Sequence, residues 1–152
     1  MFGWFKKQKK FFTEEELTGI INAIQQAEQR TSGEVRVFVE SRCKYVDAID
    51  RAIELFKELK MDQTAERNAV LIYVATKDRQ LAVYGDEGIH QKVGLAYWDF
   101  EVKKMISAFS KDDCAAGIVQ CVEDIGKALQ HHFPYNKSTD KNELPDDIVF
   151  GR

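Results

Sequence analysis

The fold of this chain is constrained most by one uninterrupted apolar run, which extends from Ala69 to Ala75. A strand with one wet face would alternate apolar and polar side chains, whereas a continuous run indicates a strand buried on both faces. An earlier segment, Val35–Val39, is β-branched or aromatic at most positions and predicts a second strand. Between the two, residues 47–59 have helical spacing, with an apolar side formed by Ile49, Ile53, Phe56 and Leu59. Strand, helix and strand of these lengths form a βαβ unit, so we expect the two strands to be parallel.

The segment after the apolar run predicts a third strand. Only the short polar link Lys77–Arg79 separates the run from Gln80–Tyr84. A link of this length implies a hairpin, so the third strand is expected to run antiparallel to the second.

Helices account for most of the remaining pattern. Thr13 and Glu16 have the spacing of a capping box at the start of a first helix. A further helical stretch is expected from Ile89 to about Phe109, interrupted near Gly94, and Asp112 or Asp113 is expected to cap a last helix. The whole pattern predicts an α/β fold, in which helices accompany a small mixed β-sheet.

The 152 residues fit one domain of ordinary size. The expected organisation is a basic, aromatic N-terminal extension (1–12), a central α/β/α domain (13–133), and a C-terminal tail that packs on the domain or trails from it (134–152). Apolar residues at 148–150 favour docking of the tail's end. For the extension, two interpretations stay open: an interfacial membrane anchor, or a segment whose Phe11 and Phe12 pack on the domain.

Composition excludes several classes of function. The formal net charge of −3 argues against nucleic acid as a partner, because phosphate binding needs a basic face. The three cysteines show no CxxC or Cys/His spacing, so neither a disulfide framework nor a zinc site is expected. No transmembrane segment of roughly 18 apolar residues occurs, and the N-terminus lacks the order of a signal peptide. We therefore expect a soluble, cytoplasmic, monomeric protein with reduced thiols.

Acidic and amide side chains gather where the strands of the predicted sheet begin or end. They are Glu34 before the first strand, Asn68 (beside Arg67) before the second, and Asp86 and Glu87 after the third. Because the third strand runs in the opposite direction, all of them are expected at the same end of the sheet. Hard cations such as Ca²⁺ or Mg²⁺ prefer several oxygen ligands, which carboxylates and an amide supply. Two simpler interpretations stay open: Asp86 and Glu87 stabilise the start of a helix, and Glu34 pairs with Arg67.

The opposite end of the sheet offers a rival site, because ligands of α/β sheets usually bind at the carboxyl ends of parallel strands. That end carries Ser41, Arg42, Asp78 and Arg79, which equally suit a solvated hairpin turn. His90 lies near Asp86 and is a candidate for acid–base chemistry, with an ordinary surface helix residue as the alternative. No phosphate-loop, dinucleotide-binding, zinc-protease or serine-hydrolase motif is present, so motifs alone name no reaction.

No single stretch of the chain is diagnostic, but several stretches in their order and spacing resemble a known family. They are Phe11–Glu16, Ala27-Glu28 with Thr31–Val37, Arg67–Tyr73, Tyr84–Ile89 and Asn142–Asp146. Together they resemble the soluble bacterial branch of the TPM domain family over about residues 11–151. That family includes a thylakoid-lumen acid phosphatase and a photosystem II repair protein.

The resemblance carries expectations of its own. It implies an α/β/α sandwich with a small mixed sheet and a divalent-cation site of acidic residues, with Ca²⁺ as the usual ion. The positions that match the family's motifs are Glu34, Asn68, Asp86, Glu87 and, at the start of the last helix, Asp113. It also implies a membrane-anchored protein partner, and phosphatase activity in some members.

Two functions from different classes agree with these expectations. The first is a module that binds Ca²⁺, or alternatively Mg²⁺, and serves protein assembly or stress response. The second is a metal-dependent acid phosphatase acting on phosphomonoesters, in which Arg67 or Arg79 would hold the phosphate oxygens. Hydrolysis would need a nucleophile, and no motif supplies one, so the binding module is favoured.

Overall fold

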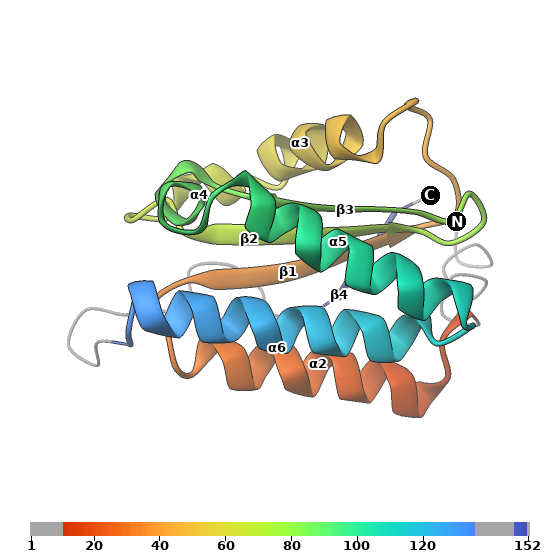
Figure 1. Cartoon of the computed structure of the whole chain (residues 1–152), viewed down its shortest axis with the longest axis horizontal. Coiled ribbons are helices and arrows are strands. Elements are labelled where there is room, and N and C mark those ends of the chain that lie inside the picture. Colours follow the sequence, from red (N-terminus) through yellow and green to blue (C-terminus); the bar gives the residue numbers. More distant parts are fainter. Residues whose placement is uncertain (1–10, 136–147, 152) are drawn as a thin grey trace.

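The sheet at the centre of the molecule has four strands in the order β3-β2-β1-β4 (Figure 1). The structure is a computed structural model that describes residues 11–135 and 148–151. The strands are β1 (Glu34–Glu40), β2 (Ala69–Ala75), β3 (Gln80–Gly85) and β4 (Ile148–Phe150). β1 and β2 are parallel, and β3 is antiparallel to β2, which confirms the predicted βαβ unit and hairpin. The expected docking of the tail's end is also observed, because β4 pairs with β1 in parallel.

Helices cover both faces of this sheet. They are α2 (Glu14–Glu28), α3 (Ala48–Glu58), α4 (Glu87–Val93), α5 (Leu95–Ser110) and α6 (Cys114–His132), with a short 3₁₀ turn at Met61–Gln63. α3 lies on one face, and α2 and α6 lie on the other (Figure 1). The predicted α/β fold, with a mixed sheet between helical layers, is confirmed. None of the helices in the described ranges combines the length and apolar character needed to cross a membrane.

The apolar run in β2 explains why two cores form. Every residue of β2 is buried, and successive side chains point to opposite faces of the sheet. Val70, Ile72 and Val74 join the core under α2, α5 and α6, whereas Leu71 and Tyr73 join the core under α3. A strand with polar residues at alternate positions could not have contributed apolar side chains to both cores.

The predicted N-terminal capping box is present at α2. The Thr13 hydroxyl accepts a hydrogen bond from the Glu16 amide at 3.0 Å, and the Glu16 carboxylate accepts one from the Thr13 amide at 2.8 Å. Phe12 is buried in the same core as Leu17, and Phe11 lies half-exposed beside Phe109. The packing alternative therefore holds for these two residues, while residues 1–10 of the predicted extension lie outside the described ranges.

The apolar side predicted for the second helix was partly wrong. The side chains of α3 that are buried are Ala52, Leu55 and Phe56, and Ile49 is 40% exposed. Ala52 is fully buried against the sheet, whereas Ile49 and Ile53 line a pocket together with residues of the edge strand β3. Asp113 is at the N-cap position of α6, but its side chain makes no capping hydrogen bond, so that part of the prediction was also wrong.

Candidate functional site

The acidic end of the sheet is organised around the guanidinium of Arg67. Asp86, although only 2% exposed, receives two hydrogen bonds from it: Nε to Oδ2 at 2.6 Å and Nη2 to Oδ1 at 2.8 Å. Arg67 Nη1 also lies 3.3 Å from Glu87 Oε1. The hydrogen bonds to Asp86 raise the pKa of the Arg67 guanidinium, and Asp62 adds to that effect through its charge. Two carboxylates, those of Asp86 and Glu87, therefore pair with one arginine.

Local backbone geometry fixes this arrangement. Arg67 adopts a left-handed conformation with φ 52°, which costs a residue other than glycine about 1 kcal/mol. Its carbonyl accepts a hydrogen bond from Gly88 N at 2.8 Å, which ties the turn before β2 to the first turn of α4. A Cβ on Gly88 would lie 2.1 Å from the Glu66 carbonyl oxygen, so only glycine fits there. Asp86 also serves the helix start, because its Oδ1 accepts from Glu87 N at 2.8 Å.

Asn68 and Glu34 lie at the same end of the sheet but have other neighbours. Asn68 Nδ2 donates to Ser32 Oγ at 3.1 Å, and Asn68 Oδ1 is buried with no hydrogen-bond partner among the described residues. Glu34 is 3% exposed. Its charge and that of Glu28 raise the pKa of Arg36, but burial has the larger effect and lowers that pKa overall. The backbones of Glu34 and Asn68 are joined, since Glu34 N donates to Asn68 O at 3.4 Å.

The prediction that these residues meet at one end of the sheet is therefore correct for their backbones. Their side chains, however, have different partners. Asp86 N donates to Ala69 O at 2.9 Å, and Ala69 is opposite Glu34 in the sheet, so the strand ends do meet. The charge partners recorded for Arg67 are Asp86, Glu87 and Asp62. Of the two simpler interpretations, the helix-start role of Asp86 is observed. For the other, the ion pairs of Arg67 are with Asp86 and Glu87 rather than with Glu34.

Asp113 and Arg79 lie at the far end of the sheet. Arg79, in the turn between β2 and β3, donates from Nη2 to the Phe109 carbonyl at 2.8 Å. Asp113 N donates to the Ala108 carbonyl at 2.9 Å, one residue away from that contact. Asp86 follows the other end of β3, and a strand of this length spans roughly 17–20 Å. The sequence-predicted ligands therefore do not form one cluster, and Arg67 and Arg79 do not face one phosphate.

The donor chemistry at the Asp86 end suits a hard cation, but the arginine already occupies the acidic oxygens. Carboxylates are the ligands that Ca²⁺ and Mg²⁺ prefer. Both oxygens of Asp86 are engaged by Arg67 in this conformation. Across residues 11–135 and 148–151, no three His, Cys, Asp or Glu side chains gather as a metal centre requires. An ion bound to Asp86 would thus have to take the place of the guanidinium of Arg67, whose side chain is 41% exposed.

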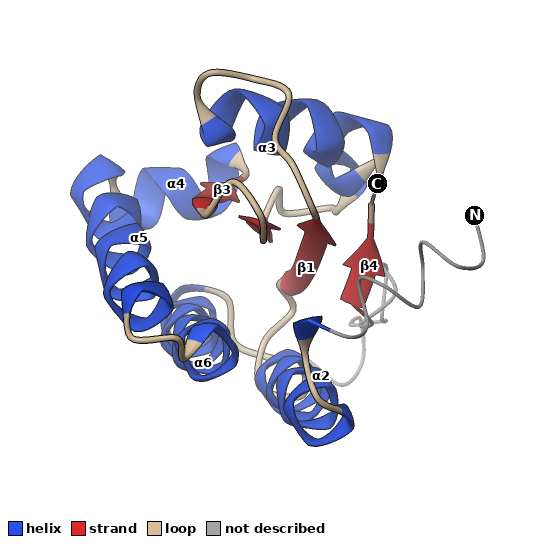
Figure 2. Ribbon diagram, turned by 90° about the vertical axis from the view of Figure 1, so that its right-hand side faces the viewer, coloured by secondary structure: helices blue, strands red, loops and turns tan. Residues whose placement is uncertain are grey.

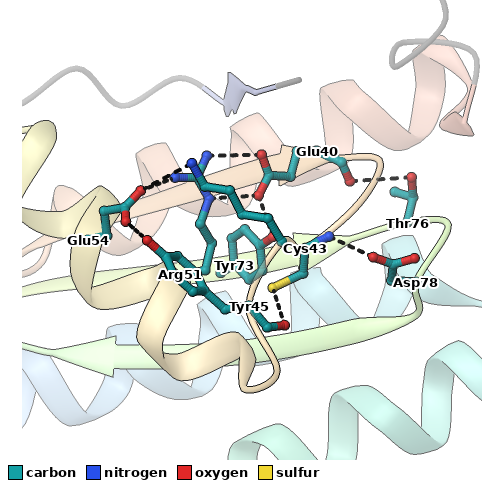
Figure 3. A network of polar contacts seen from close by, with 9 residues as sticks. Glu40, Cys43, Tyr45, Arg51, Glu54, Tyr73, Thr76 and Asp78 are labelled. Atoms are coloured by element: carbon teal, nitrogen blue, oxygen red, sulfur yellow. Dashed lines mark hydrogen bonds and ion pairs between the residues drawn. The ribbon is translucent and has the colours of Figure 1, made fainter.

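The rival end of the sheet contains a polar network that sequence reasoning missed (Figure 3). Glu40, the last residue of β1, accepts from Arg51 Nε at 2.9 Å and Arg51 Nη2 at 3.1 Å, and also from the Tyr73 hydroxyl. Burial, together with Glu40, raises the pKa of Tyr73. Arg51 also bonds Glu54 Oε1 at 2.6 Å. The signal in the sequence was a glutamate, Glu40, at the end of a strand that is apolar at most positions, followed by an arginine, Arg51, in the next helix.

A buried carboxylate on α5 was missed as well. Glu101 is 2% exposed, and burial, followed by the charge of Asp124, raises its pKa to about 7. Lys104 bridges Glu101, at 3.3 Å, and Asp124. The signal was available, because Glu101 follows Trp98 by three residues and precedes Met105 by four, which is the spacing of a core-facing position.

The remaining predicted residues have structural roles. His90 Nδ1 accepts from Trp98 Nε1 at 2.9 Å. Asp78 bonds Arg42 at 3.0 Å and the Cys43 amide at 2.8 Å, as a solvated hairpin turn would. Cys114 and Cys121 are buried free thiols, and burial raises the pKa of Cys114 to about 12.

Comparison with known proteins adds three findings. A family model described as the TPM domain matches residues 5–128. The solved structure of the BA42 protein from the psychrophilic bacterium Bizionia argentinensis is 41% identical, with 93% of this chain and 96% of that chain covered and a TM-score of 0.83. The N-terminal domain of the cg2496 protein from Corynebacterium glutamicum is 17% identical, with coverage of 88% and 80% and a TM-score of 0.57, which shows a shared fold alone. No curated protein matches the chain significantly.

Proposed function

The chain belongs to the TPM domain family, and on that premise we propose that it is a divalent-cation-binding module whose ion site lies at the Asp86 end of the sheet. Asp86 and Glu87 would supply carboxylate oxygens, and the ion would replace the Arg67 guanidinium between them. Ca²⁺ is the preferred ion and Mg²⁺ the alternative, because Ca²⁺ accepts irregular arrangements of oxygen ligands whereas Mg²⁺ demands nearly ideal octahedral geometry. A role in protein assembly or stress response is part of the same proposal.

One observation carries the proposal: the carboxylates of Asp86 and Glu87 both pair with a single arginine, whose side chain is 41% exposed. Their negative charge exceeds the positive charge of Arg67, and Asp86 is almost fully buried. A buried carboxylate needs a cationic partner, since an unpaired buried charge costs several kcal/mol. A divalent ion meets the same need with more charge, and the exposed guanidinium can leave without unfolding either strand.

A thermal melting experiment tests the proposal. Addition of millimolar CaCl₂, at constant ionic strength, is expected to raise the melting temperature relative to EDTA, because an ion that binds only the folded state stabilises it. Asp86→Asn is expected to abolish this rise. Arg67→Gln is expected to lower the melting temperature in EDTA and to enlarge the rise with Ca²⁺, because the competing cation is gone.

Two variants separate this site from the other predicted ligands. Asp113→Asn removes a carboxylate at the far end of the sheet and is expected to leave the response to Ca²⁺ unchanged. Glu34→Gln removes a carboxylate that lies at the same end of the sheet as Asp86. That carboxylate acts on Arg36 rather than on Arg67. Loss of the response in Asp113→Asn but not in Asp86→Asn would overturn the assignment, as would a wild-type melting temperature that neither ion raises.

No contact favours the alternative, a phosphatase, over the module. The two arginines predicted to bind phosphate lie at opposite ends of the sheet and are each engaged within the protein. Turnover of p-nitrophenyl phosphate by wild-type protein, lost in both Asp86→Asn and Glu34→Gln, would nevertheless establish the phosphatase.

A further inference from the structure

An apolar groove of about 800 Å³ runs along the free edge of β3. One wall is the start of α3, with Ile49 and Ile53, and the other is α5, with Trp98, Val102 and Ile106. Consecutive residues of β3, from Leu81 to Gly85, form the floor. Figure 2 shows the cause: β3 is at the outer edge of the sheet, with α3 on one side and α5 on the other.

The groove exposes large apolar side chains that folding would normally hide. Ile49 is 40% exposed, Ile106 51% and Leu95, at the far end of the α5 wall, 68%. Exposed apolar side chains gathered along one concave surface, rather than scattered singly, are typical of an interaction site.

The floor of the groove offers main-chain hydrogen bonds as well as apolar contact. β3 pairs with β2 along Val70–Ala75, and no described strand pairs with its other edge. At an edge strand, the N–H and C=O groups of alternate residues point away from the sheet. An extended peptide satisfies such a row of donors and acceptors, whereas a helix satisfies its own.

The rim of the groove is acidic. Asp47, Glu87 and Asp99 border it, against the ammonium of Lys103 and the Arg67 guanidinium that pairs with Glu87. His90, also on the border, accepts a hydrogen bond at Nδ1 from Trp98. A segment with basic flanks therefore matches the rim in charge.

We propose that this groove binds an extended segment of a partner protein, with apolar side chains at alternate positions and basic flanks, which adds to β3 as a fifth strand. Successive side chains of the bound segment would face the α3 wall and the α5 wall in turn, as the side chains of β3 do. Leu81 and Val83 belong to the core beside α5, and Ala82 and Tyr84 belong to that beside α3. The proposal does not depend on cation binding.

Selection from a phage-displayed library of random linear peptides tests this proposal, with the full chain as bait in EDTA. Enriched peptides are expected to have apolar residues at every second position and lysine or arginine at the ends. Binding of the best synthetic peptide is then measured by fluorescence polarisation. Ile106→Glu and Ile49→Glu, one on each wall, are each expected to weaken it about tenfold or more. Phe100→Glu is the matched control, since Phe100 is 60% exposed on α5 but lies outside the groove, and it is expected to bind like wild type.

Backbone pairing is tested with N-methylated peptides. N-methylation at alternate residues that face β3 is expected to abolish binding, whereas the same number of N-methyl groups shifted by one residue is expected to preserve it. Enrichment at helical spacing, equal tolerance of both N-methyl patterns, or no enrichment would each overturn the proposal. A wild-type dimer that Ile106→Glu dissociates would also overturn it, because a second copy would then be the occupant.

Discussion

At the scale of single residues, buried carboxylates are distinguished by the cations that neutralise them. Arg67 neutralises Asp86, and Lys104 neutralises Asp124. Glu101 differs, because one of its oxygens is buried without a hydrogen-bond partner among the described residues. A carboxylate in that position favours its protonated form.

Replacement of Glu101 by glutamine is therefore expected to have an effect that depends on pH. Burial raises the pKa of Glu101 from its ordinary value of 4.5 to about 7 in the folded protein. Since the folded state holds the proton more tightly, stability falls as pH rises from 4.5 to 7. Glu101→Gln removes this loss and should raise the free energy of unfolding at pH 8 by about 3 kcal/mol, with little change at pH 4.5. Urea denaturation at both values measures it, and equal destabilisation at both would show that the contact with Lys104 matters more.

The sequence pattern predicted the backbone positions of the site residues but not the partners of their side chains. The ends of apolar strands predicted where Asp86, Glu87, Asn68 and Glu34 would meet along the backbone. Side-chain partners could not be read in this way: the pairing of Arg67 with Asp86 depends on a left-handed turn, which no pattern in the sequence specifies. Glu101 was overlooked because a charged residue on an apolar stripe is usually assigned to the exposed side.

At the scale of secondary-structure elements, the ion pair between Arg51 and Glu40 fastens α3 to the sheet. Both side chains are mostly buried, at 12% and 4% exposure. Arg51→Met would leave the Glu40 carboxylate buried beside Tyr73 without its cation, and a loss of about 3 kcal/mol in the free energy of unfolding is expected. Arg42→Met is the matched control: Arg42 is 71% exposed where it pairs with Asp78, and its loss should cost at most about 1 kcal/mol. Chemical denaturation compares the two, and similar losses would contradict the role given to Arg51.

The order and type of the helices and of the first three strands followed from the sequence, whereas the strand β4 and the orientation of α3 did not. The uninterrupted apolar run fixed β2 as a central strand, and the link at Lys77–Arg79 fixed the hairpin. For α3, two helical stripes compete: one centred on Ile49 and Ile53, the other on Ala52 and Leu55. The choice between them depends on how closely the helix approaches the sheet, which is a tertiary effect that periodicity does not contain.

At the scale of the whole molecule, the two candidate surfaces adjoin and share Glu87. The Asp86 end offers carboxylates around the partly exposed Arg67, and the free edge of β3 offers an apolar groove. Because Glu87 borders the groove and bonds Arg67, an ion that displaces Arg67 would change the charge at one end of the groove.

The central claim, that a divalent ion replaces Arg67 at Asp86, is tested most directly by nuclear magnetic resonance. In a Ca²⁺ titration of ¹⁵N-labelled protein, the amides of Asp86 and Glu87 and the side-chain Nε–H of Arg67 should shift together, while the amides of Asp113 and Arg79 stay still. The Arg67 Nε–H should also exchange faster with solvent once its hydrogen bond to Asp86 is lost. Shifts confined to the Asp113 end, or an Arg67 signal unchanged at saturating Ca²⁺, would contradict the claim.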